Sequence, residues 1–260
     1  MTSDLEQDIG ACAGLVQRGD PDRFMAAMAA KPDARDVLFP LYAFNLEVAR
    51  APWLTQEAMI AEMRLQWWRD ALEEIGQGGN VRRHEVVTPL AAILDSEAVA
   101  QLDALIVARQ WDIYKDPFED AAHFAQYLEA TSGNLMWVAA RALGQADEGV
   151  VRDVAYAGGL ANWLRAIPEL EAQKRVPLVD GRAEAVALLA EGGLQRLNRA
   201  RAQRSKLTKP AGQALLAGWQ AEAILAQATK APERVADGTL GQSEFAKKAS
   251  LMWCAMSGRW

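Results

Sequence analysis

The densest acidic cluster of the sequence consists of Asp70, Glu73 and Glu74. Their spacing of three and four residues places the carboxylates on one face of a helix. Carboxylate oxygens are the ligands that Mg²⁺ prefers, and Mg²⁺ can in turn hold a diphosphate group. Charged side chains at the end of a helix are, however, typical of a solvated surface, and the apolar face of this segment lies elsewhere. The cluster predicts a solvated helix face, with a cation or diphosphate site as the alternative.

A second group consists of six cations between positions 196 and 209, with no acid among them. They are Arg196, Arg199, Arg201, Arg204, Lys206 and Lys209. Such a run is unusual in a chain of net charge -6, because solvated helix faces normally mix both signs. The run predicts either a solvated basic face or a surface for an anionic partner, which would be lipid headgroups or an acidic protein.

Other reactive residue types are sparse. His84 and His123 are isolated in the sequence, which favours surface or capping roles over ligation. The only cysteines, Cys12 and Cys254, form no Cys-x-x-Cys motif, and no Gly-x-Ser-x-Gly motif occurs. We therefore expect no zinc site and no nucleophile paired with a base.

The element that organises the chain is an apolar helix around residues 153–168. Its apolar residues recur at steps of three and four: Val154, Leu160, Trp163, Leu164 and Ile167. Gly158 and Gly159 each cost about 1 kcal/mol relative to Ala in a helix, so we expect a neighbouring helix to approach closely there. Pro168 lacks an N–H group and is expected to end or kink the helix.

The remaining segments also repeat with helical period, and none alternates with period two. Ser3, Asp20, Thr55 and Asp116 are candidate helix caps, and Pro40 predicts a kink or break inside one helix. The expected helices span residues 3–18, 20–31, 33–50, 55–75, 88–94, 96–111, 127–143, 182–198, 211–227 and 243–256. We therefore predict an all-α protein with a single domain over residues 1–260.

Composition narrows the functional class. The 260 residues are 51% apolar and 24% charged, which is typical of a globular protein. The net charge of -6 argues against binding to nucleic acid, which requires neutralisation of phosphates. The acidic N-terminal residues and the absence of an apolar run of 18 residues predict a cytoplasmic protein that is at most peripheral to a membrane.

Four segments together resemble a known family. They are Leu41-Tyr42-Ala43-Phe44, Arg64-Leu65-Gln66-Trp67-Trp68, Tyr127 to Gly133, and the Gly-rich helix that ends in Leu164-Arg165 and is followed by Arg175-Val176-Pro177-Leu178. In this order, over about two thirds of the chain, they are similar to the signatures of the squalene/phytoene synthase family. The resemblance implies an isoprenoid-synthase-type helical bundle around a central cavity.

In active members of that family, two Asp-x-x-x-Asp motifs on facing helices hold Mg²⁺, which neutralises the diphosphate of a prenyl substrate. Alignment by these segments places Ala49, Arg50 and Trp53 at the first motif, and Ala166 and Leu170 at the second. None of the four aspartates is present. We therefore predict no catalytic residue, no metal ligand, no cofactor, and no cluster of three carboxylates in the cavity.

The resemblance also indicates candidate cavity residues, which flank the positions where the family binds diphosphate. They are Asn45, Glu47, Arg50, Asn162, Arg165, Glu169 and Arg175. Arg50 beside the lost first motif reverses the local charge, so the cavity could attract an anion directly. One hypothesis is a buried polar network of Asn45, Glu47, Arg50 and Arg165, and the other is a retained pocket for an isoprenoid or lipid.

The segments Ala43 to Glu47, Met63 to Trp68 and Leu164 to Pro168 resemble a branch of the family without the aspartates, related to a mitochondrial complex I assembly factor. This resemblance implies a binding or respiratory-complex assembly protein at the inner face of the cytoplasmic membrane. The alternative is an active prenyltransferase that condenses two prenyl diphosphates head-to-head with Mg²⁺. A lipid or isoprenoid carrier is a third hypothesis.

Overall fold

The computed structural model describes residues 2–260, with side chains from residue 4 onward, so the expected cap Ser3 lies outside the described side chains. No β-strand occurs over these residues, and the all-α prediction is confirmed. The α-helices are α1 Thr2–Gly19, α2 Pro21–Ala29, α3 Pro32–Arg50, α4 Ala58–Gln77, α5 Val87–Ala91, α6 Ser96–Tyr114, α7 Ala121–Leu128, α8 Asn134–Leu143, α9 Glu148–Ala172, α10 Ala183–Ala202, α11 Lys209–Gly212, α12 Ala221–Lys230, α13 Glu233–Ala236 and α14 Glu244–Ser257.

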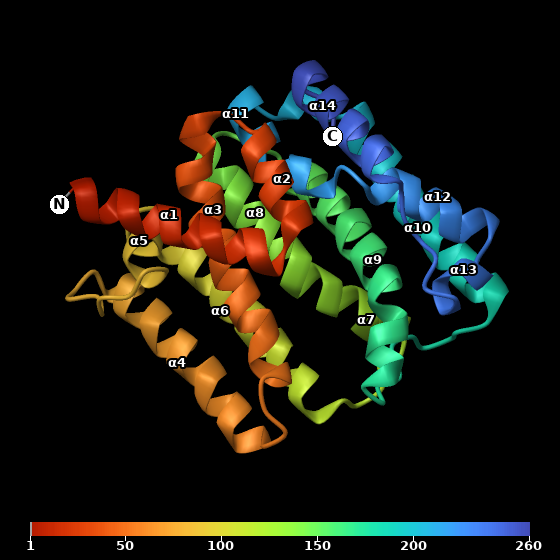
Figure 1. The fold of residues 1–260 in the computed structure, drawn as a ribbon, viewed down its shortest axis with the longest axis horizontal. Helices are drawn as coiled ribbons and strands as arrows, with labels where there is room; N and C mark the ends of the chain where they lie inside the picture. Colours follow the sequence, from red (N-terminus) through yellow and green to blue (C-terminus); the bar gives the residue numbers. More distant parts are fainter. Residues whose placement is uncertain (1) are drawn as a thin grey trace.

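Helix α9 lies at the centre of the bundle and packs against α8, α10 and α12 (Figure 1). On the other side of the molecule, α6 packs against α4 and α8, and α3 packs against α1. Fourteen residues of α9 are buried, from Val150 to Leu170, so almost every side of the helix is covered. A helix with so many buried residues must be enclosed by other elements over most of its surface, as α9 is.

The glycine pair of α9 marks two close approaches. A Cβ atom on Gly159 would lie 2.5 Å from Oγ and 2.8 Å from Cβ of Ser132, and one on Gly158 would lie 3.4 Å from Cα of Gly218. A side chain at Gly159 would therefore clash with Ser132, whereas a Cβ atom at Gly158 would just reach van der Waals contact with the backbone of Gly218. The expected close approach is therefore confirmed, and it explains why glycine is present despite its low helix propensity.

Both prolines that were expected to break or kink a helix lie inside continuous helices. Helix α9 extends four residues beyond Pro168, and α3 runs through Pro40 without interruption. The prediction of a break was wrong at both positions. Proline removes one backbone hydrogen bond, but the buried side chains that follow, Leu170 in α9 and Leu41 in α3, keep the helix packed on the core.

The expected caps are correct in one case out of three. The Asp20 carboxylate accepts a hydrogen bond from the Arg23 N–H at 3.0 Å and caps α2. Helix α4 begins only after Glu57, so Thr55 does not cap it, and α7 is capped by Asp120 instead of Asp116. The local sequence therefore identified side chains that can accept a hydrogen bond at a helix N-terminus, but it did not identify the residue at which each helix begins.

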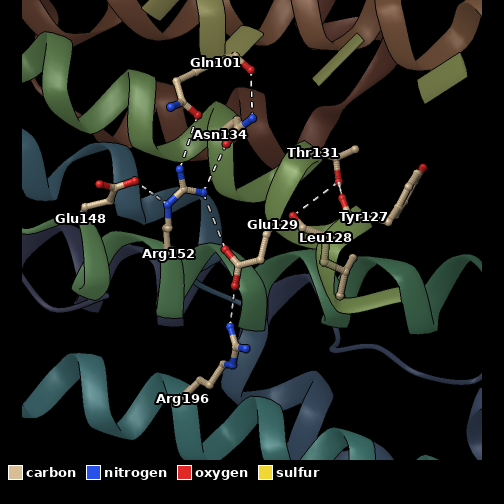
Figure 2. Close-up of polar contacts among 9 residues, drawn as sticks. All are labelled: Gln101, Tyr127, Leu128, Glu129, Thr131, Asn134, Glu148, Arg152 and Arg196. Carbon is tan, nitrogen blue, oxygen red and sulfur yellow. Dashed lines mark hydrogen bonds and ion pairs between the residues drawn. The ribbon is translucent and has the colours of Figure 1, made fainter. Parts of the chain in front are cut away.

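Two long predicted helices are divided. A π-helical turn, Glu129–Gly133, separates α7 from α8, and within it the Thr131 hydroxyl donates to the Tyr127 carbonyl at 2.7 Å (Figure 2). Similarly, a 3-10 turn, Ala214–Gly218, lies between α11 and α12. Both turns face the glycines of α9 described above, and a π-turn inside a helix is frequently found at a functional site.

Candidate functional site

A cavity of about 390 Å³ lies between α2, α3, α6, α9 and the two irregular turns. Of the residues aligned with the family's two acidic motifs, Ala49, Trp53, Ala166 and Leu170 line it, whereas Arg50 does not. The structure thus brings the two signature segments to opposite walls of one cavity, although more than a hundred residues separate them in the chain.

Three of the seven candidate residues line this cavity: Asn45, Asn162 and Arg165. Asn45 is buried, whereas Asn162 is exposed at the rim. The Arg165 guanidinium donates to the Asp22 carboxylate of α2 at 2.9 Å, so it is paired with a residue that the signatures do not contain.

Glu47 and Arg50 do not line the cavity. They form a loose ion pair with each other at 3.9 Å, and both side chains are partly exposed. The predicted buried network of Asn45, Glu47, Arg50 and Arg165 is therefore wrong. At 100° per residue, Glu47 and Arg50 lie on the opposite side of α3 from Asn45, which shares its face with Ala49.

Glu169 and Arg175 also lie outside the cavity, in opposite environments. Glu169 is exposed and accepts a hydrogen bond from Gln173 at 3.2 Å. Arg175 is fully buried, 2.6 Å from Asp112 and over the ring of Trp111 at 4.2 Å.

Three carboxylates line the cavity, contrary to expectation: Asp20, Asp22 and Asp112. Each has an arginine partner, because Arg23 lies 2.9 Å from Asp20, Arg165 lies 2.9 Å from Asp22, and Arg109 lies 3.1 Å from Asp112. Sequence reasoning missed these acids because α2 and α6 contribute them, outside the signature segments, and no spacing links them.

The pKa of Asp22 is set by opposing effects. Partial burial favours its neutral form, but hydrogen bonds from Arg165 and Gln220 and the nearby charges of Arg165 and Lys247 outweigh that effect. The pKa of Asp22 therefore lies below its ordinary value, and the group is a carboxylate at neutral pH.

Asp112 is the most buried acid of the site. It accepts hydrogen bonds from the Tyr127 hydroxyl at 2.8 and 3.0 Å and pairs with two guanidinium groups, Arg109 and Arg175. Burial raises the pKa of Tyr127 far above its ordinary value, so the phenol remains a donor. The nitrogens of Arg175 meet no acceptor with hydrogen-bond geometry, so this pair is held by charge and by stacking on Trp111. The carboxylate oxygens of Asp112 are thus occupied by contacts with Tyr127, Arg109 and Arg175.

These residues do not fit the Mg²⁺–diphosphate arrangement that the family implies. Mg²⁺ needs oxygen ligands in near-octahedral geometry, and the motif residues that line the cavity offer only hydrocarbon and indole side chains. The carboxylates that line the cavity are engaged by guanidinium groups. Within the part of the chain that the structure describes, no group of three His, Cys, Asp or Glu side chains could hold a metal ion.

The predicted basic run is divided among several partners. Arg196 pairs with Glu129, Arg199 with Asp153, Arg201 with Glu222, and Lys206 with Asp147, at distances of 2.6, 2.6, 2.7 and 3.4 Å. Among the side chains described, Arg204 and Lys209 form no ion pair. The segment itself contains no acid, and the acids that pair with its cations come from other parts of the chain.

Figure 2 shows the best connected of these pairs. Glu129 of the π-helical turn lies between Arg196 of α10, at 2.6 Å, and Arg152 of α9, at 3.7 Å. Arg152 also bonds to Glu148 and to Asn134, at 2.7 and 3.2 Å. Arg196 stacks over the Tyr156 ring at 3.8 Å. Arg196 therefore ties α10 to α9 and to the π-turn that borders the cavity.

The acidic cluster of α4 consists of side chains with separate partners. Asp70 accepts from Gln66 at 2.6 Å, Glu73 from Gln77 at 2.9 Å, and Glu74 pairs with Arg82 at 2.6 Å. The three therefore lie at or near the surface, on ordinary helix-surface contacts. This placement matches the solvated-face interpretation.

The two histidines accept backbone hydrogen bonds. His84 Nδ1 accepts from the Val86 N–H at 3.1 Å, and His123 Nδ1 accepts from the Glu119 N–H at 3.4 Å. Both therefore have local capping roles.

Across residues 2–260, no helix has the length and hydropathy needed to cross a bilayer.

Comparison with known proteins agrees with this geometry. The sequence model described as Squalene/phytoene synthase matches residues 16–180, well over half of the chain. Among solved structures, a dehydrosqualene synthase in complex with ligand has a TM-score of 0.79 at 14% identity, covering 98% of this chain and 97% of its own. The squalene synthase HpnC from Alicyclobacillus acidocaldarius has a TM-score of 0.72 at 17% identity, covering 88% and 95%. The expected isoprenoid-synthase fold is confirmed.

The curated relatives have a different kind of name. A protein of Drosophila melanogaster, named as a homolog of NADH dehydrogenase (ubiquinone) complex I, assembly factor 6, is 27% identical over 181 residues, which are 65% of this chain and 53% of that protein. The assembly factor 6 of Homo sapiens is 21% identical over 169 residues, 64% of this chain and 51% of that protein. The chain thus spans about half the length of the curated relatives it matches. By its sequence match and its fold, the chain belongs to the squalene/phytoene synthase family.

Proposed function

We propose that this protein is a non-catalytic member of its family that acts in the assembly of a respiratory NADH dehydrogenase, at the inner face of the cytoplasmic membrane. The observation that carries the proposal is the composition of the cavity wall. Ala49, Trp53, Ala166 and Leu170 face one cavity, and none of their side chains has an oxygen that could coordinate Mg²⁺. The names of the curated relatives supply the partner.

The chemical argument concerns the leaving group. Release of diphosphate from an allylic substrate develops negative charge, which an enzyme must neutralise with metal ions or with positioned donors. In this cavity each lining arginine already has an acid partner: Arg23 is paired with Asp20, Arg109 with Asp112, and Arg165 with Asp22. The cavity therefore lacks both the metal ligands and unengaged positive charge for that step.

Two measurements test the proposal. Purified protein incubated with farnesyl or geranylgeranyl diphosphate and Mg²⁺ should release no pyrophosphate, and steady release would contradict the loss of catalysis. In a host from which the gene is deleted, the amount of assembled NADH dehydrogenase should fall and should recover with the wild-type gene. Normal assembly in the deletion strain would contradict the assembly role.

A second candidate function is the binding of an isoprenoid or lipid without turnover. It is favoured by a cavity of about 390 Å³ that combines apolar side chains such as Trp53, Leu128 and Leu170 with arginines at one end. Calorimetry with farnesyl diphosphate in the presence of EDTA tests it. Saturable binding without metal would support a carrier, whereas binding only with Mg²⁺ would favour the prenyltransferase alternative.

A further inference from the structure

Helix α14 presents an apolar face that nothing in the described chain covers. Phe245, Met252, Trp253 and Met256 are 83%, 61%, 63% and 80% exposed. At 100° per residue, Phe245, Met252 and Met256 fall within an arc of about 40°. Four large apolar side chains on one exposed helix surface are unusual, because the apolar stripe of a surface helix normally faces the core.

The opposite face of α14 fixes the helix on the protein. Leu251 is buried, and Lys247, which is 16% exposed, lies 3.7 Å from Asp22 of α2. The outward direction of the four apolar side chains is therefore set by packing on the inner face.

A basic pocket borders the C-terminal end of this apolar face. The pocket has a volume of about 490 Å³ and is lined by residues of α11 and α14, which are neighbours in Figure 1. Its lining contains three cations, Lys31, Arg204 and Lys209, and no acidic residue among those described. All three are exposed.

Arg204 and Lys209 differ from the other four cations between 196 and 209, and Lys31 lines the same pocket. Arg196, Arg199, Arg201 and Lys206 are paired with acids, whereas no ion pair involves Lys31, Arg204 or Lys209 among the described side chains. In a chain of net charge -6, an acid-free group of this kind is a local reversal of sign. Lys248 on α14 and Arg259, which follows the end of α14, are both exposed and add further positive charge.

Together these features match a helix that lies in the plane of a bilayer surface. Such helices insert Phe, Trp and aliphatic side chains to the depth of the acyl boundary and hold anionic headgroups with flanking Lys and Arg. We propose that α14, together with Lys31, Arg204 and Lys209, is a docking surface for an anionic lipid bilayer. An acidic protein would account for the cations, but it gives no reason for long apolar side chains to remain exposed beside them.

The docking surface rests on the membrane location in the proposed function, but its test is separate from the assembly role, because vesicle binding can be measured without a respiratory complex. The full chain is sedimented with vesicles of phosphatidylcholine alone, or with about 30 mol% phosphatidylglycerol. We expect binding only to the anionic vesicles and a loss of binding when ionic strength is raised from about 0.1 M to about 0.5 M.

A triple variant tests the pocket. Lys31→Gln, Arg204→Gln and Lys209→Gln together should weaken the partition coefficient about 100-fold, since each cation near an anionic surface contributes about fivefold. The matched control is Arg18→Gln, Arg64→Gln and Lys174→Gln, which changes the net charge equally at exposed positions that line no part of the pocket. Equal binding by the two triple variants would overturn the proposed location.

Insertion of the apolar face is tested separately. Cys254→Ser with Met256→Cys provides one exposed thiol for an environment-sensitive fluorophore, because Cys12 is fully buried. Emission from the fluorophore should rise and shift to the blue with anionic vesicles. Binding without that shift would show that the apolar face stays in water. Failure of the wild-type chain to bind anionic vesicles would refute the proposal of a bilayer-docking surface and would favour a protein partner for this surface.

Discussion

Arg165 reaches from α9 across the cavity to Asp22 of α2, where its guanidinium lies 2.9 Å from the carboxylate. Arg165 follows directly on Leu164 at the second signature segment, and the next residue is Ala166 instead of an aspartate. The arginine thus bonds to a carboxylate from a different helix, which closes one side of the cavity with a pair of opposite charges.

This pair should make a pH-dependent contribution to stability. The pKa of Asp22 is lower in the folded protein than its ordinary value of 3.8, so ionisation favours folding. The contribution is complete above the unfolded pKa and is lost as the pH falls through the folded pKa. We expect Asp22→Asn to lower the free energy of unfolding by about 1 kcal/mol at pH 7 and by less at lower pH.

Urea denaturation of wild type and Asp22→Asn at pH 7 and in steps below pH 4 measures this difference. A difference between the two proteins that stays constant down to the lowest pH would show that the charge of Asp22 is not what stabilises the pair.

Loss of the buried carboxylate of Asp112 should destabilise the protein far more than loss of a carboxylate in a surface ion pair. Asp112→Ala leaves Arg109 and Arg175 without their carboxylate, and removing one partner of a buried pair typically costs about 3–5 kcal/mol. Asp180→Ala removes a partner from Arg182, whose side chain is 81% exposed, and should leave the stability nearly unchanged, because solvent screens the pair. Thermal or urea unfolding of the two variants makes the comparison, and similar losses would contradict the structural role of Asp112.

Two Gly→Ala substitutions should have opposite effects. Gly159→Ala places Cβ against Ser132 and should cost about 1–3 kcal/mol through overpacking. Gly192→Ala in α10 meets no atom within 4 Å and should stabilise the protein by up to about 1 kcal/mol, because alanine has the higher helix propensity. Stability curves for both variants test the close approach of the π-turn to α9, which a stabilising Gly159→Ala would exclude.

The two thiols should differ in reactivity. Burial, helped by the charges of Glu85 and Asp8, raises the pKa of Cys12 to about 12, and Cys254 is only partly covered. In the native protein, Ellman's reagent should modify one thiol per chain, and Cys254→Ser should abolish that reaction. In denaturant both thiols should react. Rapid modification of Cys12 in the folded protein would mean that α1 opens from the core.

The sequence by itself determined the helical fold and the absence of aspartates from the aligned motif positions. The period of apolar residues in segments such as 153–168 is a local property, and it predicted the helices. The signature segments likewise showed which residues replace the aspartates, because motif spacing is read along one helix. The close approach at Gly158 and Gly159 followed from the low helix propensity of glycine.

Only the tertiary structure decided which side chains meet. Asp22 and Arg165 are 143 residues apart, and no local pattern links them. Glu47 and Arg50 lie on the side of α3 that faces away from the cavity. Four of the six cations between 196 and 209 are paired with acids from other parts of the chain. Charge pairing depends on distances in space that the packing of helices sets, whereas periodicity records only how each helix is oriented toward the core.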